Sequence, residues 1–149
     1  MTTIVATRDA LGGDSMVYQE AKEQWYPAKK VMRLKGLIAG AAGDAGDCVR
    51  FLDWVKHDFA DKKKPKFSES TGDKDASILL MVTPEGIFTM DQDDPYPEEV
   101  DAQYHAIGSG AKAALGAFFM GATIEQALEA AAKHDPYTRG PFTILKLKE

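Results

Sequence analysis

The spacing of hydrophobic and polar residues changes along the chain, and these changes predict its secondary structure. Residues Thr2–Thr7 and Ala10–Ser15 are short apolar runs on either side of Arg8 and Asp9, which predicts two strands joined by a turn. Residues 18–27 are largely polar and follow no clear period. The pattern therefore favours no regular element in that stretch.

Residues 28–35 alternate in the manner of a strand with two different faces. One face carries Ala28, Lys30, Met32 and Leu34, and the other carries Lys29, Val31, Arg33 and Lys35. Lys30 thus lies among apolar side chains, where a lysine is costly to bury unless it is paired or functional. Snorkelling at the strand end is the alternative explanation. Asp14, at the end of the second short strand, is a candidate partner for a buried Lys30.

Helical spacing begins after Asp44, which is a candidate N-cap. Gly36 before it predicts a turn, and the small apolar residues 37–43 predict a buried strand. The apolar stripe of the helix consists of Cys48, Phe51, Leu52, Val55 and Phe59. Residues Asp61–Asp75 are polar and contain Pro65 and Gly72, which predicts a surface loop.

The rest of the chain predicts further strands followed by helices. Residues 76–91 indicate a hairpin that turns at Pro84–Gly86, and residues 104–110 indicate another strand. Residues 91–101 are an acidic loop without the glycine and terminal glutamate of an EF-hand. Helices are predicted over Gly110–Met120 and after a Thr123–Gln126 capping box, to about His134, and a final strand over 141–148. Grouped strands and grouped helices indicate an α+β fold with mostly antiparallel sheets.

Composition narrows the class of protein. A chain of 149 residues, 44% of them apolar, is expected to form a single domain over 1–149. The net charge of −5 argues against nucleic-acid binding and against binding to anionic membranes. Cys48 is the only cysteine, so an intrachain disulfide is excluded and a reducing compartment is favoured. We see no signal peptide and no apolar run near the ~20 residues of a membrane span, so we expect a cytoplasmic protein.

Several motifs are better explained by a structural role than by a catalytic, metal-binding or cofactor-binding role. The three histidines, His57, His105 and His134, show no metal-ligand spacing, and no metal or cofactor is expected. Cys48 lies on the apolar stripe of a helix and is interpreted as a small core residue. Residues 108–113 read GSGAKA after a strand, but a second helix follows where a dinucleotide-binding fold needs a parallel strand. Ser109 does not fit GxSxG, because Ile107 occupies the first glycine position.

Five segments, taken in order, resemble the threonine peptidases of the proteasome β-subunit family, most closely the bacterial HslV type. MTTIV resembles the processed start of that family, in which methionine is removed and threonine becomes the first residue. KKVMRL resembles the segment with the catalytic lysine, here Lys30, and LIAGAAGDAGD resembles the glycine-rich corner that forms the oxyanion hole. AIGSG matches the strand with a supporting serine, here Ser109. DPYT resembles the pair that supports the nucleophile, here Asp135 and Thr138.

The resemblance implies a fold and a set of roles. The fold is the four-layer αββα sandwich of N-terminal nucleophile hydrolases, with a shortened outer helix layer where the 61–75 loop replaces a helix. Thr2 would supply the nucleophilic hydroxyl and, once exposed, the α-amine that acts as base. Lys30 would favour deprotonation of the hydroxyl, and Asp14 would orient Lys30. The N–H of Gly43 would stabilise the oxyanion.

The resemblance also implies a function. The leading hypothesis is an HslV-like threonine peptidase that cleaves peptides or unfolded proteins within a homo-oligomer, with a ring and an ATPase unfoldase as further expectations. A catalytically inactive assembly protein with the same fold is one alternative. An N-terminal nucleophile amidohydrolase acting on a small amide is another, because the nucleophile chemistry is shared.

Overall fold

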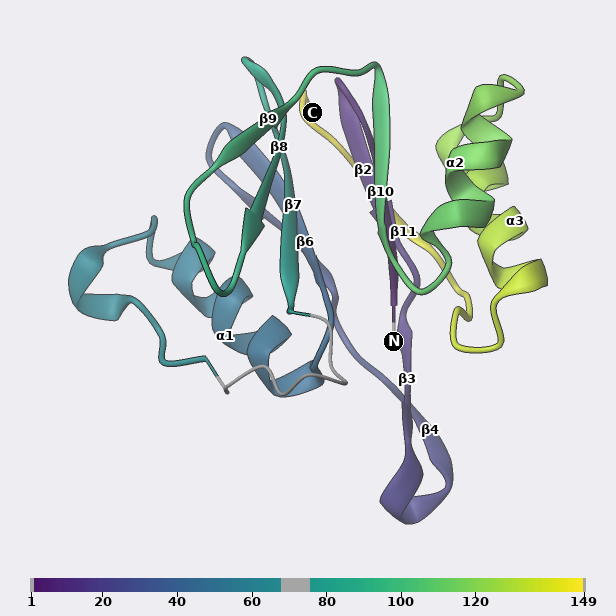
Figure 1. The fold of residues 1–149 in the computed structure, drawn as a ribbon, viewed down its shortest axis with the longest axis horizontal. Helices are drawn as coiled ribbons and strands as arrows, with labels where there is room; N and C mark the ends of the chain where they lie inside the picture. The colour runs from purple at the N-terminus through teal and green to yellow at the C-terminus, as the bar shows by residue number, and fades with distance from the viewer. Residues whose placement is uncertain (1, 68–75, 149) are drawn as a thin grey trace.

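Four layers of secondary structure stack across the molecule, as predicted (Figure 1). The computed structural model describes residues 2–67 and 76–148. Helix α1 (Ala45–Lys56) covers one outer face, and helices α2 (Ala111–Phe119) and α3 (Ile124–His134) cover the other. Two antiparallel sheets lie between these helix layers. The prediction of a four-layer αββα fold is therefore confirmed. Within the described residues, one of the two outer layers contains a single α-helix, α1.

The first sheet contains the start of the chain at its centre. Its order is β10-β1-β2-β11, formed by strands Tyr104–Gly108, Thr3–Thr7, Ala10–Gly13 and Thr143–Lys146. All three pairings are antiparallel, and Thr3 pairs with Gly108. The strands predicted at the start and at the end of the chain are thus confirmed. They belong to one sheet, in which β11 pairs with β2.

The second sheet has the order β5-β6-β7-β8-β9. Its strands are Val31–Leu34, Leu37–Ala42, Ile78–Thr83, Gly86–Asp91 and Glu98–Val100. The predicted hairpin with its turn at Pro84–Gly86 is confirmed as β7 and β8. The prediction of an acidic loop over 91–101 is partly wrong, because β9 extends the sheet there by pairing with β8. β9 is an edge strand whose side chains are mostly exposed, so its sequence, Glu-Glu-Val, lacks the apolar pattern that predicts a strand.

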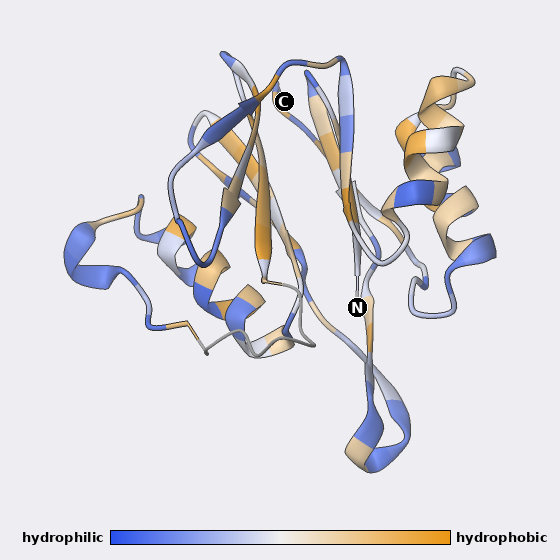
Figure 2. Ribbon diagram, in the orientation of Figure 1, coloured by the Kyte–Doolittle hydropathy of each residue, from blue (hydrophilic) through white to orange (hydrophobic). Residues whose placement is uncertain are grey.

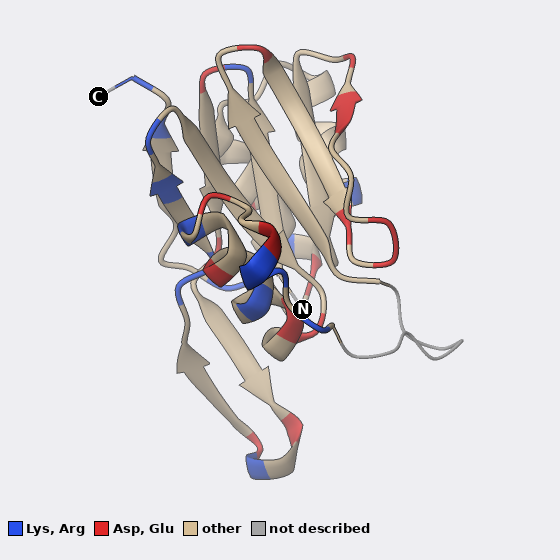
Figure 3. Cartoon of the chain, turned by 90° about the vertical axis from the view of Figure 1, so that its left-hand side faces the viewer, with Lys and Arg blue, Asp and Glu red and all other residues tan. Residues whose placement is uncertain are grey.

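A third, two-stranded sheet forms where no element was predicted. Strands β3 (Met16–Gln19) and β4 (Gln24–Pro27) form a hairpin that projects from the body of the molecule, with a 3₁₀ turn at Glu20–Lys22 (Figures 1 and 3). Tyr18 and Trp25 pair across it, with ring centroids 5.4 Å apart. The strands face solvent on much of their surface, so they lack the apolar alternation that marks a half-buried strand.

The predicted surface loop over 61–75 is only partly described. It begins with a 3₁₀ turn at Asp61–Lys63, and residues 68–75 lie outside the described residues. No helix in the described part of the chain is both long and apolar enough to cross a membrane.

Three apolar clusters hold the layers together, and the inner strands are correspondingly the most hydrophobic in Figure 2. Strand β1 contributes to two of them. Ile4 packs into the cluster between the sheets, and Val5 packs under α2 and α3. Because both faces of β1 are covered, its side chains are buried from Thr3 to Ala6.

Helix α1 begins after Asp44 as predicted and packs against the second sheet, but it ends at Lys56, so Phe59 of the predicted stripe lies beyond it. The Asp44 side chain accepts a hydrogen bond from the Asp47 N–H at 3.1 Å and caps the helix. Phe51 and Val55 of the predicted stripe are buried, and Trp54, which the stripe did not include, is buried beside them. Helix α3 begins with the predicted capping box, in which Thr123 and Gln126 each accept the other's backbone N–H.

One predicted strand face is wrong. Val31 was assigned to the polar face of its strand with Arg33, yet it is buried in the cluster between the sheets. The two faces of β5 are both covered near its start, because one faces α1 and the other faces the first sheet. Arg33 and Lys35 are exposed, as predicted.

A matched pair of phenylalanines tests this packing. Phe51, on the face of α1 that packs against the second sheet, is fully buried, whereas Phe119 at the end of α2 is 69% exposed. We expect Phe51→Ala to lower the free energy of unfolding by about 3–5 kcal/mol, through lost burial and a cavity. Phe119→Ala should change it by less than about 0.5 kcal/mol. Urea unfolding curves of both variants measure the difference, and equal losses would contradict the layer assignment.

Candidate active site

A buried ion pair forms the centre of the candidate site. Lys30 Nζ lies 2.9 Å from Asp14 Oδ2, and the two side chains are 5% and 0% exposed. Lys30 also donates to the Met16 carbonyl at 2.6 Å, at the base of the projecting hairpin. The structure therefore brings together the lysine and the carboxylate that the sequence suggested as partners.

The start of β1 lies against this pair. The Thr3 N–H donates to Asp14 Oδ1 at 3.1 Å, and the Thr2 carbonyl accepts from the Ser109 N–H at 2.9 Å. Thr2 is buried. Ile4 packs toward the second sheet, between Gly13 and Gly40, so strand alternation directs the Thr2 side chain to the same side. Lys30 also approaches Asp14 from the second sheet, because its carbonyl accepts from the Ala41 N–H of β6.

Hydroxyl groups form a second network on the opposite face of β1. The Thr3 hydroxyl lies 2.6 Å from the Thr138 hydroxyl and accepts from the Gly110 N–H at 3.0 Å. Asp135 Oδ2 accepts from both Thr138 and Ser109, each at 2.5 Å. The structure thus joins three of the predicted site residues through one carboxylate and connects them to the strand that carries Thr2.

Arg139, which the sequence did not suggest, connects the two networks. Its backbone N–H donates to Asp14 Oδ2 at 3.2 Å, and its guanidinium carbon lies 4.0 Å from the ring centroid of Trp25. Its carbonyl accepts from the Ser15 N–H. The loop after α3 and the base of the hairpin therefore meet at the Asp14 carboxylate. The neighbouring DPYT segment was the signal that could have directed attention to Arg139.

Gly43 forms the corner between β6 and α1, as predicted. Its φ of +133° is a conformation that favours glycine, and an added Cβ would lie 2.4 Å from Ser77 Oγ. Two residues earlier, the Ala41 N–H donates to the Lys30 carbonyl at 3.2 Å. Backbone pairing thus links the corner to Lys30, while Gly43 makes no direct bond to the ion pair within the described residues.

Burial shifts the acid–base properties of the pair in opposite directions. It raises the pKa of Asp14, although Lys30 and the Thr3 and Arg139 amides oppose the shift. It lowers the pKa of Lys30, although Asp14 opposes that shift. Both pKa shifts arise because a charge is costly in a poorly hydrated site. They bring the pKa values of Asp14 and Lys30 closer together.

A pocket of about 910 Å³ opens beside Lys30, between β5 and α1. Its apolar walls include Met32, Leu34, Val49 and Leu52, and Lys56 and Asp53 add charge at α1. Val49, which lines this pocket, is 68% exposed. An apolar side chain of a ligand would fit this pocket.

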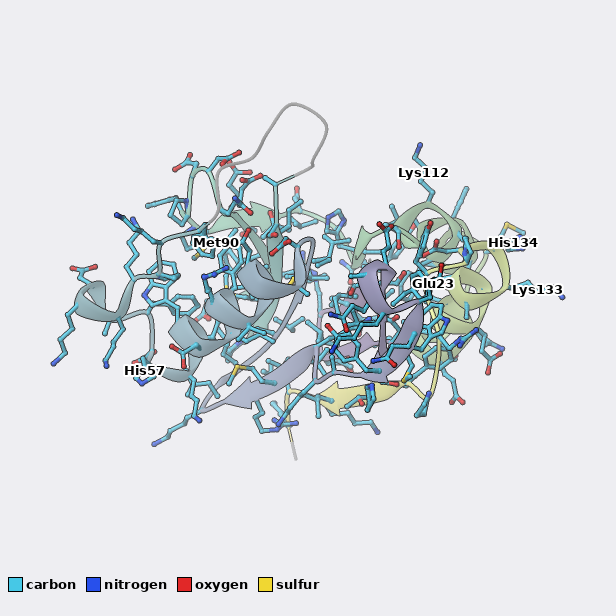
Figure 4. The ribbon with its side chains drawn as sticks, turned by 90° about the horizontal axis from the view of Figure 1, so that it is seen from below. Glu23, His57, Met90, Lys112, Lys133 and His134 are labelled. Atoms are coloured by element: carbon cyan, nitrogen blue, oxygen red, sulfur yellow. The ribbon has the colours of Figure 1, made fainter. Side chains whose placement is uncertain are left out.

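The remaining candidate groups are two distant histidines and Cys48, whose thiol interacts electrostatically with Lys30. Figure 4 shows His57 on the α1 side of the molecule and His134 on the α2–α3 side. Burial raises the pKa of the Cys48 thiol to about 12, so it is a poor nucleophile. No group of metal-binding side chains is found within residues 2–67 and 76–148.

Several solved structures share this fold. BPH from Thiobacillus denitrificans in complex with epoxomicin has a TM-score of 0.67 and 17% identity, covering 99% of both chains. Eukaryotic HslV from Trypanosoma brucei has a TM-score of 0.69 and 17% identity, covering 97% of this chain and 98% of its own. A Gly-1 mutant of Anbu from Hyphomicrobium sp. strain MC1 has a TM-score of 0.70 and 10% identity, covering 98% and 81%.

The similarity lies in the fold rather than in the overall sequence. No family model and no curated protein sequence matches the chain. The chain nevertheless shares its fold with these structures, HslV among them, along nearly its whole length. The fold suggested by the five short segments is thus confirmed.

Replacing Lys30 with methionine tests the buried pair. In Lys30→Met, the ammonium that opposes the effect of burial on Asp14 is lost. The pKa of Asp14 would therefore rise further, because only backbone amides still oppose the shift. A carboxyl whose folded pKa lies above its unfolded value stabilises the fold at low pH and loses that contribution as the pH rises. We expect a deficit of about 3–5 kcal/mol near pH 7 and a smaller deficit near pH 4, measured by urea unfolding.

The exposed neighbour provides the control for this measurement. Lys29→Met removes the same charge one residue away, where the side chain is exposed, and should leave the free energy of unfolding nearly unchanged at both pH values. A deficit in Lys30→Met that stays constant with pH would show that Asp14 does not change its protonation in response.

Proposed function

We propose that this protein is an HslV-like threonine peptidase that hydrolyses peptide bonds with Thr2 as its nucleophile. The observation that carries the proposal is the buried Lys30–Asp14 pair, bonded through Asp14 to the amide that follows Thr2. A buried ion pair adds little to stability when compared with apolar packing. Its position at the start of β1, beside a pocket, therefore favours a chemical role.

Removal of the residue before Thr2 would expose an α-amine, whose ordinary pKa of about 7.7–8.0 suits a general base. The Thr2 hydroxyl would attack the carbonyl carbon of a peptide bond while its proton passes to this amine. The tetrahedral intermediate would then collapse, breaking the C–N bond, and the leaving amine would take up the proton. Water would hydrolyse the resulting ester on Thr2 and restore the hydroxyl.

The other site residues would each have a separate task. Lys30 would place its ammonium near the Thr2 hydroxyl and favour the alkoxide, while Asp14 would hold Lys30 in position. The Gly43 N–H would donate to the oxyanion that develops on the substrate carbonyl. Asp135 would support the start of β1 through the Ser109 and Thr138 hydroxyls.

The proposal extends to substrate and assembly. The apolar pocket beside Lys30 would hold the side chain that precedes the cleaved bond, so peptides with leucine-like residues are the favoured substrates. As for HslV, we propose a cytoplasmic homo-oligomer that encloses its sites in a ring and receives unfolded chains from an ATPase. The proteasome-type fold supports the oligomer.

A peptide epoxyketone tests the nucleophile and the base together. The compound offers one electrophilic centre to a hydroxyl and a second to an amine, and the two groups occur together on a free N-terminal threonine. We expect the protein from its natural host to have a mass without the residue before Thr2, and to gain one adduct per subunit. Intact-mass measurement before and after incubation records both changes.

Variants of Thr2 separate this proposal from its alternatives. Thr2→Ala should form no adduct, whereas an adduct that persists would show that the nucleophile is another residue. A wild-type protein that keeps the preceding residue and remains unlabelled would favour a non-catalytic assembly protein. Labelling with turnover of small amides, but not of peptides, would favour an amidohydrolase.

The two adjacent lysines test the role given to Lys30. Lys30→Ala should lower kcat by at least ~100-fold, because the ammonium beside the hydroxyl is lost. Lys29→Ala should retain nearly full activity, since its side chain is exposed. Hydrolysis of a fluorogenic peptide ending in leucine measures both rates, and equal losses would contradict the role of Lys30.

A further inference from the structure

Ser77, which none of the motifs includes, lies against the glycine corner of the candidate site. Its side chain is fully buried just before β7, and its hydroxyl accepts the Asp44 N–H at 3.0 Å. A Cβ on Gly43 would lie 2.6 Å from Ser77 Cα, so the two residues are in direct backbone contact. Ser77 therefore touches the corner through both its backbone and its hydroxyl.

Ser77 is itself held by Gln92, which follows β8. The Ser77 N–H donates to Gln92 Oε1 at 2.8 Å, and the Ser77 carbonyl accepts from the Gln92 N–H at 3.0 Å. Gln92 is also buried. These bonds continue the β7–β8 ladder beyond the Ile78–Asp91 pair, so they fix Ser77 at the end of these two inner strands.

The bond from Asp44 to Ser77 fixes the orientation of two peptide groups. It holds the plane of the Gly43–Asp44 peptide directly, and the contact with Ser77 restricts φ of Gly43 to its value of +133°. On the other side, Ala42 pairs with Ile78 in the ladder. The Ala42–Gly43 peptide, which carries the Gly43 N–H, is thus fixed from both ends.

We propose that Ser77 is a positioning residue that aims the Gly43 N–H at the oxyanion. This inference rests on the peptidase function proposed above. Ser77 acts through Gly43 and touches no substrate atom. An oxyanion donor is effective only when it is already oriented before the reaction, because reorientation in the transition state costs free energy. Loss of the Ser77 hydroxyl leaves Gly43 in place but frees the peptide group beside it.

The test compares Ser77→Ala with the wild type in peptide hydrolysis and in inhibition by a leucine-ending peptide aldehyde. The aldehyde forms a hemiacetal with the Thr2 hydroxyl, whose oxygen occupies the oxyanion position. Ser77→Ala should lower kcat and weaken aldehyde inhibition by about 10-fold, with KM unchanged. This loss is smaller than the ~10²–10³-fold loss expected when an oxyanion donor is removed.

The hydroxyl of Thr83, at the far end of the strand that follows Ser77, provides the control. Thr83, at the other end of β7, accepts the Glu85 N–H at 3.1 Å through its side chain. Thr83→Ala removes the same kind of bond away from the site and should leave kcat, KM and aldehyde inhibition unchanged. If Ser77→Ala does not fold, Ser77→Cys keeps the size with a weaker acceptor and should show the same pattern to a smaller degree.

Titration with the epoxyketone gives the concentration of active sites and separates the two proposals. If the wild type forms the Thr2 adduct but Ser77→Ala retains wild-type kcat and aldehyde inhibition per site, the role of Ser77 is wrong and the peptidase function stands. A loss confined to the number of active sites, or a change in KM alone, would likewise reject positioning. If the wild type forms no adduct, both proposals fail.

Discussion

The ion pair between Lys30 and Asp14 is the interaction on which the arrangement of the site depends. Two charges with almost no exposed surface need partners for their remaining hydrogen-bonding atoms, or the desolvation cost exceeds the attraction between them. Those partners are backbone groups of Thr3, Met16 and Arg139. The first strand, the hairpin base and the loop after α3 must therefore meet at one point. Segments far apart in sequence are held together by a local electrostatic requirement.

The same requirement accounts for the attachment of the projecting hairpin. A two-stranded hairpin is marginally stable alone, and β3–β4 contacts the body mainly at its base. At the base the Met16 carbonyl accepts from Lys30, and nearer the tip Arg139 stacks over Trp25, which pairs with Tyr18. Any change at Trp25 or Arg139 would thus reach the ion pair without an intervening element. The base of the hairpin therefore helps to hold the candidate site in place, although the tip of the hairpin lies far from the site.

The sequence predicted the elements with strong local patterns and missed those without them. Helix α1, the α3 capping box and the β7–β8 hairpin depend on neighbouring residues, and all three are confirmed. No side chain of the β3–β4 hairpin or of β9 is fully buried, so no apolar alternation marked them. Ser77 accepts a hydrogen bond from Asp44, 33 positions earlier in the chain, and this long-range contact has no local signature. The Lys30–Asp14 pair was inferred because a lysine on an apolar face needs a partner.

The position of β1 at the centre of its sheet gives the start of the chain an unusual environment. Strands at the ends of a chain often lie at an edge, whereas β1 is paired on both sides and covered on both faces. Thr2 is consequently held by the sheet rather than by a loop, and its neighbour Thr3 is bonded on one side to Asp14 and on the other to Thr138. A nucleophile at this position would lose little entropy on reaching its reactive geometry, because the fold has already restricted it. Low hydration would also strengthen the field of Lys30 at the hydroxyl. The burial that makes the ion pair costly is therefore the property that would make it useful.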